Sequence, residues 1–520
     1  MVMGTIQSSR YTPCAEASRA KGPVLEGDGN RSLPATLRRR DFLKTSLAAA
    51  GAVCAGIRPA TAGSPPAKAD SVIFIWLPGG VAQTDTWDTK EFTPFRTGMR
   101  GDELLGTCPT IPTEVDGLRL GEGLENMASI MHRGTVLRSL ANETKFGAVH
   151  LKAQYYMMTG CLFPVGVKAP SLGAAIARTL GPRDANVPPY IYIGRDVDTS
   201  DTEKQFISEF IGPGFYGVRH APFMIPDPTQ GMATLSSAAG LTHERIDRRL
   251  KLLQGASKLA AKELQASEKA ADYLRIMEQA RAMMDSAVKR AFTYIKEEKP
   301  ATLAAYQPRI AAEELLDPKY FFGARFGHGL LLARRLVERG ARFVQVEYQY
   351  GPFKGFDTHD DGAVRLAELK KQIDGPIAQL IRDLDDRGLL ERTMVVVATE
   401  FGRTIANQPK AGIEPIGFAE RQTGEDLVIE NEKMYGFHGH FSSANSLLFF
   451  GGGFQRGLVY GRTADEHPMV AVEKPVSLTD VHATIYHALG IPPDTAYVTE
   501  GRPFHVTKDG KGRPIDALLT

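Results

Sequence analysis

The sequence is poor in cysteine, which restricts the chemistry open to it. Only 4 of its 520 residues are cysteine, and Cys14 and Cys54 lie in an N-terminal segment that we predict is removed. The remaining Cys108 and Cys161 cannot form a zinc site of the CxxC type. In an oxidising compartment they form either a disulfide or two separate buried thiols, and the sequence leaves both alternatives open.

An excess of charge and a membrane-spanning segment are also missing. The formal net charge is +2, and residues 1–62 hold 9 Lys+Arg against 4 Asp+Glu, which leaves 53 against 56 in the remainder. The chain after residue 62 therefore has a net charge of about −3, and a protein of this charge has no electrostatic reason to bind nucleic acid. No run beyond residue 62 approaches the ~18 apolar residues that a membrane span needs. We therefore expect no nucleic-acid partner and no stable membrane anchor after signal cleavage.

Two common catalytic signatures are not supported either. The triglycine Gly451–Gly453 follows an apolar run, but no helix-opening GxGxxG or Walker pattern surrounds it. The chain has no GxSxG nucleophile elbow. A nucleotide site at the triglycine and a serine-hydrolase site are therefore not expected.

Residues 38–62 have the pattern of an export signal. Arg39–Lys44 (RRDFLK) is a twin-arginine motif, a mildly apolar Ala-rich segment follows, and Ala60–Ala62 is a cleavage site of the A-x-A type. We expect residues 1–37 to be a disordered leader. The pattern predicts export by the twin-arginine machinery to the periplasm or another extracytoplasmic compartment.

Predicted strands and helices alternate from residue 71 to 490. The strands are Ser71–Pro78, Gly134–Leu140, Pro189–Gly194, Ala341–Gln349, Thr393–Thr399 and Asn445–Phe450. The helices include Gly147–Gly160, Leu330–Gly340, Gln372–Arg387 and Thr479–Leu489. This alternation is typical of an α/β fold with a doubly wound, mostly parallel sheet. The charged, Ala/Leu-rich stretch 241–299 predicts a helical insertion into a single domain of residues 63–520.

Acidic and histidine residues gather next to several predicted strands. In parallel α/β sheets, ligand sites lie beyond the carboxyl ends of the strands. The segments concerned are Asp85 and Asp88, Asp357-x-His359-Asp360-Asp361, Glu400–Arg403, and His438-x-His440. Carboxylates and imidazoles are suitable ligands for zinc, manganese or calcium. A single Asp can equally cap a turn, and the two loop histidines can lie on the surface, so the common position of these segments carries the hypothesis.

These segments, in this order, resemble the family of exported proteins known as domain of unknown function 1501. That family belongs with sulfatases in the alkaline-phosphatase-like superfamily. The matching stretches are VIFIWLPGGVAQTDTWDTK, VHLKAQYYMMTG, LLLARRLVERGARFVQVE, FDTHDD, DLDDRGLLERTMVVVATEFGRT and LTDVHATIYHALG. The resemblance covers roughly residues 70–492. It implies an alkaline-phosphatase-like sheet with a metal site at its carboxyl edge, and hydrolysis of phosphate or sulfate esters.

The resemblance also implies ligand positions. Asp357 and His359 resemble the Asp and His ligands of one metal position, and His440 resembles its last histidine. Glu400 falls where the superfamily has an acidic ligand, but Phe401 stands where its histidine partner is expected. A site with two metals of the usual kind is therefore not expected.

The first predicted strand departs from the superfamily as well. It ends in Gly79-Gly80 instead of acidic ligands, which leaves Asp85 as the nearest substitute. We therefore expect a single divalent metal (zinc, calcium or manganese) with ligands drawn from Asp85, Asp357, His359, Glu400 and His440.

The nucleophile position is the largest departure from the sulfatases. Counting back from Met158–Gly160 at the sulfatase spacing leads to His150, where sulfatases have a Cys or Ser that becomes formylglycine. An imidazole can be a nucleophile, a general base or a metal ligand. Arg403 has the planar fork that suits a tetrahedral oxyanion, so we expect His150 and Arg403 to face a small anionic ester substrate. The alternative is a catalytically degenerate relative that acts as a periplasmic binding or scaffold protein.

Overall fold

The computed structural model describes most of the chain beyond the predicted signal. The described residues are 64–141, 149–162, 167–194, 209–230, 242–259, 281, 287–348, 355–359, 361–405, 427–499 and 501–520. All of them lie in the second of two units, Gly63–Thr520. The leader, the twin-arginine motif and the cleavage position fall outside the described residues and stay predictions. Within those ranges, every helix is too short or too polar to cross a membrane.

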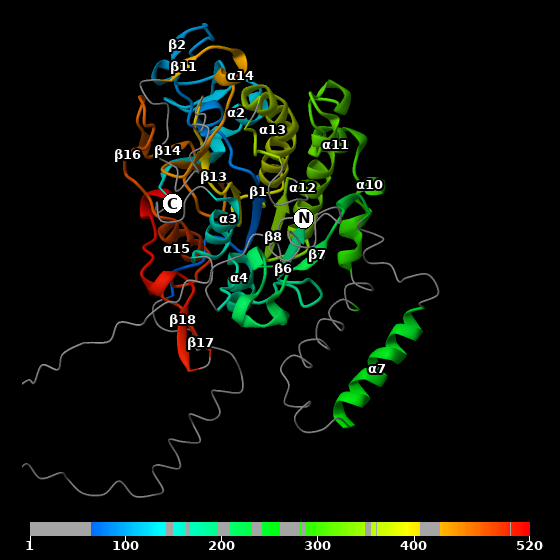
Figure 1. Ribbon diagram of the computed structural model, residues 1–520. Coiled ribbons are helices and arrows are strands. Elements are labelled where there is room, and N and C mark those ends of the chain that lie inside the picture. The colour runs from blue at the N-terminus through cyan, green and yellow to red at the C-terminus, as the bar shows by residue number, and fades with distance from the viewer. Residues whose placement is uncertain are drawn as a thin grey trace, which may run out of the picture. The chain divides into compact units, whose positions relative to one another are not determined.

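An eight-stranded sheet forms the centre of the fold (Figure 1). Its strands, in spatial order, are β14 (Leu458–Tyr460), β5 (Gly134–Leu140), β13 (Asn445–Phe450), β9 (Thr393–Ala398), β1 (Ser71–Trp76), β8 (Phe343–Glu347), β6 (Tyr190–Ile193) and β7 (Phe223–Ile225). Strand β1 pairs in parallel with both β8 and β9, and Ile73 lies opposite Val344 and Val395. Strand β13 runs antiparallel to its neighbours β5 and β9. The predicted α/β fold with a mostly parallel sheet is confirmed.

Helices cover both faces of this sheet. One face carries α12 (Gly323–Glu338) and α13 (Gly362–Asp386), and the other carries α3 (His150–Thr159), α4 (Leu172–Leu180) and α15 (Leu478–Ala488). The side chains of β1 alternate between two apolar cores, with Ile73 and Ile75 in the first and Phe74 and Trp76 in the second. Burial on both faces explains why these strands are continuous apolar runs in the sequence.

Several element boundaries differ from the predictions, and helix α12, for example, begins at Gly323, seven residues before the predicted Leu330. Helix α13 begins at Gly362, ten residues before the predicted Gln372, and contains Pro376 in its interior. Helix α7 (His243–Leu259) is the first part of the predicted insertion, whose residues 260–280 and 282–286 lie outside the described part of the chain. Cys108 and Cys161 are both free, so the structure shows separate thiols instead of a disulfide.

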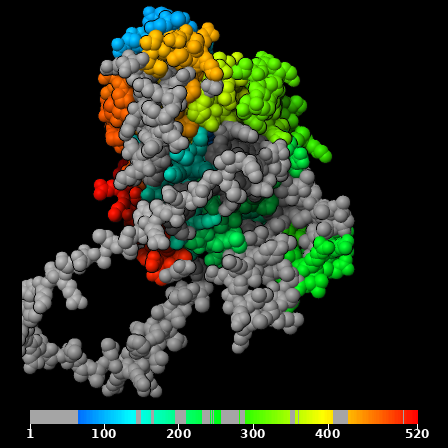
Figure 2. All heavy atoms as spheres, viewed as in Figure 1, coloured from blue at the N-terminus to red at the C-terminus, as the bar shows by residue number. Residues whose placement is uncertain are grey.

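Segments far apart in the sequence meet at one end of the molecule. Strand β2 (Met99–Arg100) pairs antiparallel with β11 (Val428–Ile429), and Met99 and Ile429 share a small apolar cluster. The space-filling view shows these blue and orange segments side by side at the top (Figure 2). The early part of the domain and the segment before β13 are therefore fixed to each other.

The direction of β13 decides where the residues around it lie. Because β13 runs antiparallel to β9, it begins at the edge where β9 ends. The histidine loop that precedes β13 therefore reaches the carboxyl edge of the sheet. The triglycine that follows β13 lies at the opposite edge, where Gly451 packs against Leu390 and Gly452 against Met394 at the start of β9.

Strand β1 leads into two glycines that no other residue type can replace without strain. Gly79 has a φ of +111° and Gly80 a φ of +86°, which side chains rarely adopt. A Cβ on Gly79 would overlap the backbone nitrogen of Asp357, and one on Gly80 would lie 2.6 Å from the ring of Phe401. The close approach of this turn to two loops therefore requires glycine at both positions.

We expect Gly79→Ala to destabilise the protein by about 2–5 kcal/mol, because backbone strain and steric overlap add. Gly98→Ala is the control: Gly98 has a φ of +84°, but a Cβ on this residue would have no atom within 4 Å, so strain alone should cost about 1–2 kcal/mol. Urea unfolding followed by tryptophan fluorescence measures both. Equal losses in the two variants would contradict the close approach of β1 to Asp357.

Candidate metal centre

Four side chains meet at the carboxyl edge of the sheet. They are His150, Asp357, His359 and His440, and one ligand atom from each lies within 4.8 Å of all the others. His150 is the first residue of α3, Asp357 and His359 lie in the loop between β8 and α13, and His440 begins β12 (His440–Phe441). Three separate segments therefore supply this cluster. Asp360 lies outside the described residues.

Asp357 lies at the centre of the cluster. The Nε2 atoms of His359, His150 and His440 lie 3.0, 3.3 and 3.5 Å from its Oδ1 atom. The ring centroid of His440 is 4.5 Å from that of His150 and 4.7 Å from that of His359. The side chain of His359 is 42% exposed and that of His150 only 13%. The cluster is therefore open to solvent on the His359 side.

Glu400 holds His150 by the other ring nitrogen. This carboxylate is fully buried, and its Oε1 atom lies 2.8 Å from Nδ1 of His150. The same oxygen accepts hydrogen bonds from the backbone N of Gly79, at 2.9 Å, and from Nε2 of Gln154, at 3.0 Å. His150 and Gln154 are four residues apart, so one face of α3 presents both to Glu400. Glu400 thus fixes the His150 ring while Nε2 points at Asp357.

Arg403 supports the cluster from inside the protein. Its side chain is fully buried, and its guanidinium donates hydrogen bonds to the Asp357 carboxylate and to the carbonyls of Gly79, Gly80 and His438. Arg403 lies in β10 (Gly402–Arg403), which pairs with β12 and places Arg403 opposite His440. This burial differs from the predicted contact of Arg403 with substrate, and it gives the guanidinium a role in positioning Asp357.

Asp85 lies in a different buried cluster. Its carboxylate accepts hydrogen bonds from the backbone N (2.8 Å) and the hydroxyl of Thr107, and lies 3.8 Å from Nε2 of His438. Nδ1 of His438 is 2.9 Å from Oγ1 of Thr358, which stands between Asp357 and His359. The structure does not bring Asp85 to the predicted metal site, because its partners hold it behind the loop.

The charged groups of the cluster shift one another's pKa. Burial raises the pKa of Asp357, but its bonds to the three histidines and Arg403 outweigh burial and hold that pKa well below its usual range. Burial lowers the pKa of His440 to about 4. Burial also lowers the pKa of His150, but Asp357 and Glu400 together raise it above its usual value. At neutral pH the centre therefore presents an ionised Asp357 and a neutral His440.

Sequence reasoning missed two buried residues beside this centre. Gln154 lies four residues after His150. This spacing places both side chains on one face of a helix, and it was the signal in the sequence that they contact the same partner. Glu347 ends the buried strand β8, and a carboxylate at the carboxyl end of a predicted strand was the corresponding signal. Burial and the neighbouring charge of Glu400 raise the pKa of Glu347 well above its usual value.

At alkaline pH, the Glu347→Gln variant should be more stable than the wild-type protein. Because the folded-state pKa is raised, the contribution of Glu347 to stability is fully present below its ordinary pKa and is lost as pH rises through the folded-state pKa. The neutral amide removes this loss, so the advantage of the variant over wild type should grow from pH 5 to pH 9 in urea unfolding. The exposed Glu391→Gln is the control. A variant that loses stability equally at all pH values would show that Glu347 is ionised in the fold.

The fold and the site define an α/β protein with a His/Asp cluster at the carboxyl edge of its sheet. The chain belongs to the family described as "Protein of unknown function (DUF1501)", which matches residues 69–519. This match confirms the family that the sequence resembles. Comparison with curated proteins found no match.

Solved structures with a similar fold include sulfatases and phosphatases. A PsFucS1 sulfatase from Pseudoalteromonas sp. is 13% identical, with a TM-score of 0.35 over 92% of this chain and 78% of its own. The lipoteichoic acid synthase LtaP from Listeria monocytogenes is 9% identical, with a TM-score of 0.32 over 86% and 76%. A mutant of the alkaline phosphatase PafA is 9% identical, with a TM-score of 0.38 over 87% and 99%. At these TM-scores, function follows only from this chain's own side chains.

Proposed function

We propose that this protein is an exported, metal-dependent hydrolase of phosphate or sulfate esters. A single divalent metal is held by His150, Asp357, His359 and His440. The observation that carries the proposal is the convergence of three imidazole Nε2 atoms on Oδ1 of Asp357, at 3.0 to 3.5 Å. Ligand atoms 2.0–2.1 Å from a tetrahedral zinc lie about 3.3–3.4 Å from one another. The donor types suit such an ion, and the three distances to Oδ1 are close to this value, while the four ligand atoms as a set lie within 4.8 Å of one another.

This ligand set differs from the one proposed from the sequence. His150 takes the place of Asp85 and Glu400, which contact other partners. Both ring nitrogens of His150 face carboxylates, Glu400 at 2.8 Å and Asp357 at 3.3 Å. That environment suits a metal ligand better than a nucleophile. Histidines that bind metals commonly donate their other N–H to a carboxylate, which fixes the tautomer and orients the ring. Glu400 is placed to do this for His150.

A bound metal would polarise the ester oxygen and lower the pKa of a water molecule. The chain's own residues prepare the site for that chemistry. Arg403 holds Asp357 ionised and in place. The Glu400 carboxylate accepts a hydrogen bond from Nδ1–H of His150 and so fixes the tautomer in which Nε2 is free for a metal. In the overall reaction, the bond between the ester oxygen and phosphorus or sulfur breaks, a water oxygen takes its place, and the alcohol leaves with a proton.

Export by the twin-arginine machinery to the periplasm or another extracytoplasmic compartment is part of the proposal. The motif Arg39–Lys44 and the cleavage pattern Ala60–Ala62 support it. The ligands come from segments almost 300 residues apart in the sequence, so the metal site exists only in the folded chain. A route that exports folded proteins suits such a site.

The metal centre can be tested by elemental analysis of protein purified after export. Wild type should hold about one divalent ion per chain. His359→Ala and His440→Ala should each remove it, and Glu400→Gln should weaken metal affinity by about 10–100-fold, the effect of losing an outer carboxylate. His505→Ala, an exposed histidine elsewhere in the domain, is the matched control. Absence of metal from wild type, with these variants unaltered in stability, would refute the centre.

Turnover is the second test of the proposed function. Metal-loaded protein should hydrolyse at least one ester in a broad panel of phosphate and sulfate monoesters. A chelator should abolish this activity, and one of zinc, manganese or calcium should restore it. His359→Ala should lower kcat/KM by at least about 100-fold, because loss of the metal removes several kcal/mol of transition-state stabilisation. Stable metal binding without any turnover would instead favour a periplasmic binding or scaffold protein.

A further inference from the structure

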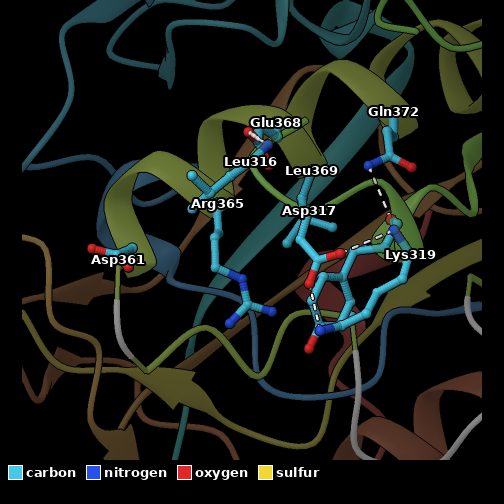
Figure 3. Close-up of a pocket in the computed structure, with 10 residues that line it drawn as sticks. Leu316, Asp317, Lys319, Asp361, Arg365, Glu368, Leu369 and Gln372 are labelled. Carbon is cyan, nitrogen blue, oxygen red and sulfur yellow. Dashed lines mark hydrogen bonds and ion pairs between the residues drawn. The ribbon is translucent and has the colours of Figure 1, made fainter. Parts of the chain in front are cut away.

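A pocket lies beside the loop that carries Asp357 and His359. Its volume is about 430 Å³, which is within the ~300–1,000 Å³ range of small-molecule sites. It is lined by residues of α13 and of the segment before α12, and Figure 3 shows these side chains around it. Gly355 and Asp361 also line it, and they flank the segment Asp357–His359 on both sides. The pocket and the metal centre therefore share one short loop.

Two of the acidic groups that line the pocket are already engaged. Asp317 forms an ion pair with Lys319. Glu368 accepts a hydrogen bond from the backbone N of Leu316 at 2.6 Å. Asp361 points away from the guanidinium of Arg365 in Figure 3. The pocket therefore holds two cationic side chains, Arg365 and Lys319, and two of its three acidic side chains have partners in the pocket wall.

Arg365 is the distinctive group of the pocket. Its guanidinium lies 4.7 Å from the centroid of the Tyr320 ring, and Figure 3 shows it extending from α13 across the pocket. The ammonium of Lys319 lies 4.9 Å from the same centroid. A planar guanidinium held against an aromatic ring is arranged to bind an oxyanion through two parallel hydrogen bonds.

We propose that this pocket binds the alcohol part of the substrate, and that Arg365 selects an alcohol that carries a second oxyanion. The substrate class is then a phosphate or sulfate ester of an acidic, ring-sized alcohol. This inference rests on the proposed function and deepens it. Arg365 takes no part in bond breaking. It holds the alcohol while the bond from the ester oxygen to phosphorus or sulfur breaks.

A matched pair of esters tests the selection in metal-loaded protein. The pair is a 4-nitrophenyl ester and the same ester with a carboxylate on the ring. Wild type should favour the carboxylated ester by about ten-fold in kcat/KM, the effect of one hydrogen bond between charged groups. Arg365→Gln should abolish this preference and Arg365→Lys should retain part of it. Lys371→Ala, which removes an exposed positive charge from α13 outside the pocket, should keep the full preference.

A binding measurement separates failure of the pocket from failure of the proposed function. Calorimetry with 4-hydroxybenzoate and with phenol requires no turnover. Wild type should bind 4-hydroxybenzoate about ten-fold more tightly than Arg365→Gln does, while phenol should not distinguish the two proteins. If this difference is found but no ester is hydrolysed, the hydrolase proposal fails and the pocket stands. The pocket proposal is overturned if esters are hydrolysed but Arg365→Gln changes neither the kcat/KM preference for the carboxylated ester nor the affinity for 4-hydroxybenzoate.

Discussion

The buried charge of Arg403 is the constraint on which the site depends. A guanidinium with no solvent exposure is costly unless every donor finds an acceptor. Its acceptors are the Asp357 carboxylate and the carbonyls of Gly79, Gly80 and His438. One side chain thus joins the ends of β1 and β9 to the loop after β8 and the loop before β13. Asp357 is held at the centre of three imidazoles because Arg403 requires a counter-charge there.

Much of the fold follows from local sequence, but the site follows only in part. The predicted ranges of β5 and β13 match the structure, because both are short stretches rich in apolar and β-branched or aromatic residues, a composition and length that favour a buried strand. The direction of β13 is not encoded in NSLLFF, since that run has the same pattern whether the strand is parallel or antiparallel. Direction is set by pairing with β5 and β9, and it decides that His440 and not the triglycine joins the site.

The individual roles were harder to predict than the location. Asp85 and Glu400 both follow strands that end at the same edge, and both are fully buried. Their different roles come from partners distant in sequence: Thr107 and His438 for Asp85, His150 for Glu400. His150 and Glu400 are separated by 250 positions, and no local pattern reports such a contact. The spacing of His150 and Gln154 is compatible with a shared partner, but it becomes informative only when the shared acceptor is known.

The apolar ring of Phe401 packs against two imidazoles of the cluster. Phe401 is fully buried, and its ring centroid lies 5.0 Å from that of His150 and 4.8 Å from that of His440. An apolar ring at this position gives no ligand for a second ion and excludes water from one side of the imidazoles. A lower local dielectric favours the neutral imidazole, in line with the pKa of His440 at about 4. Because a metal binds only the neutral ring, this packing would prepare His440 as a ligand in the proposed centre.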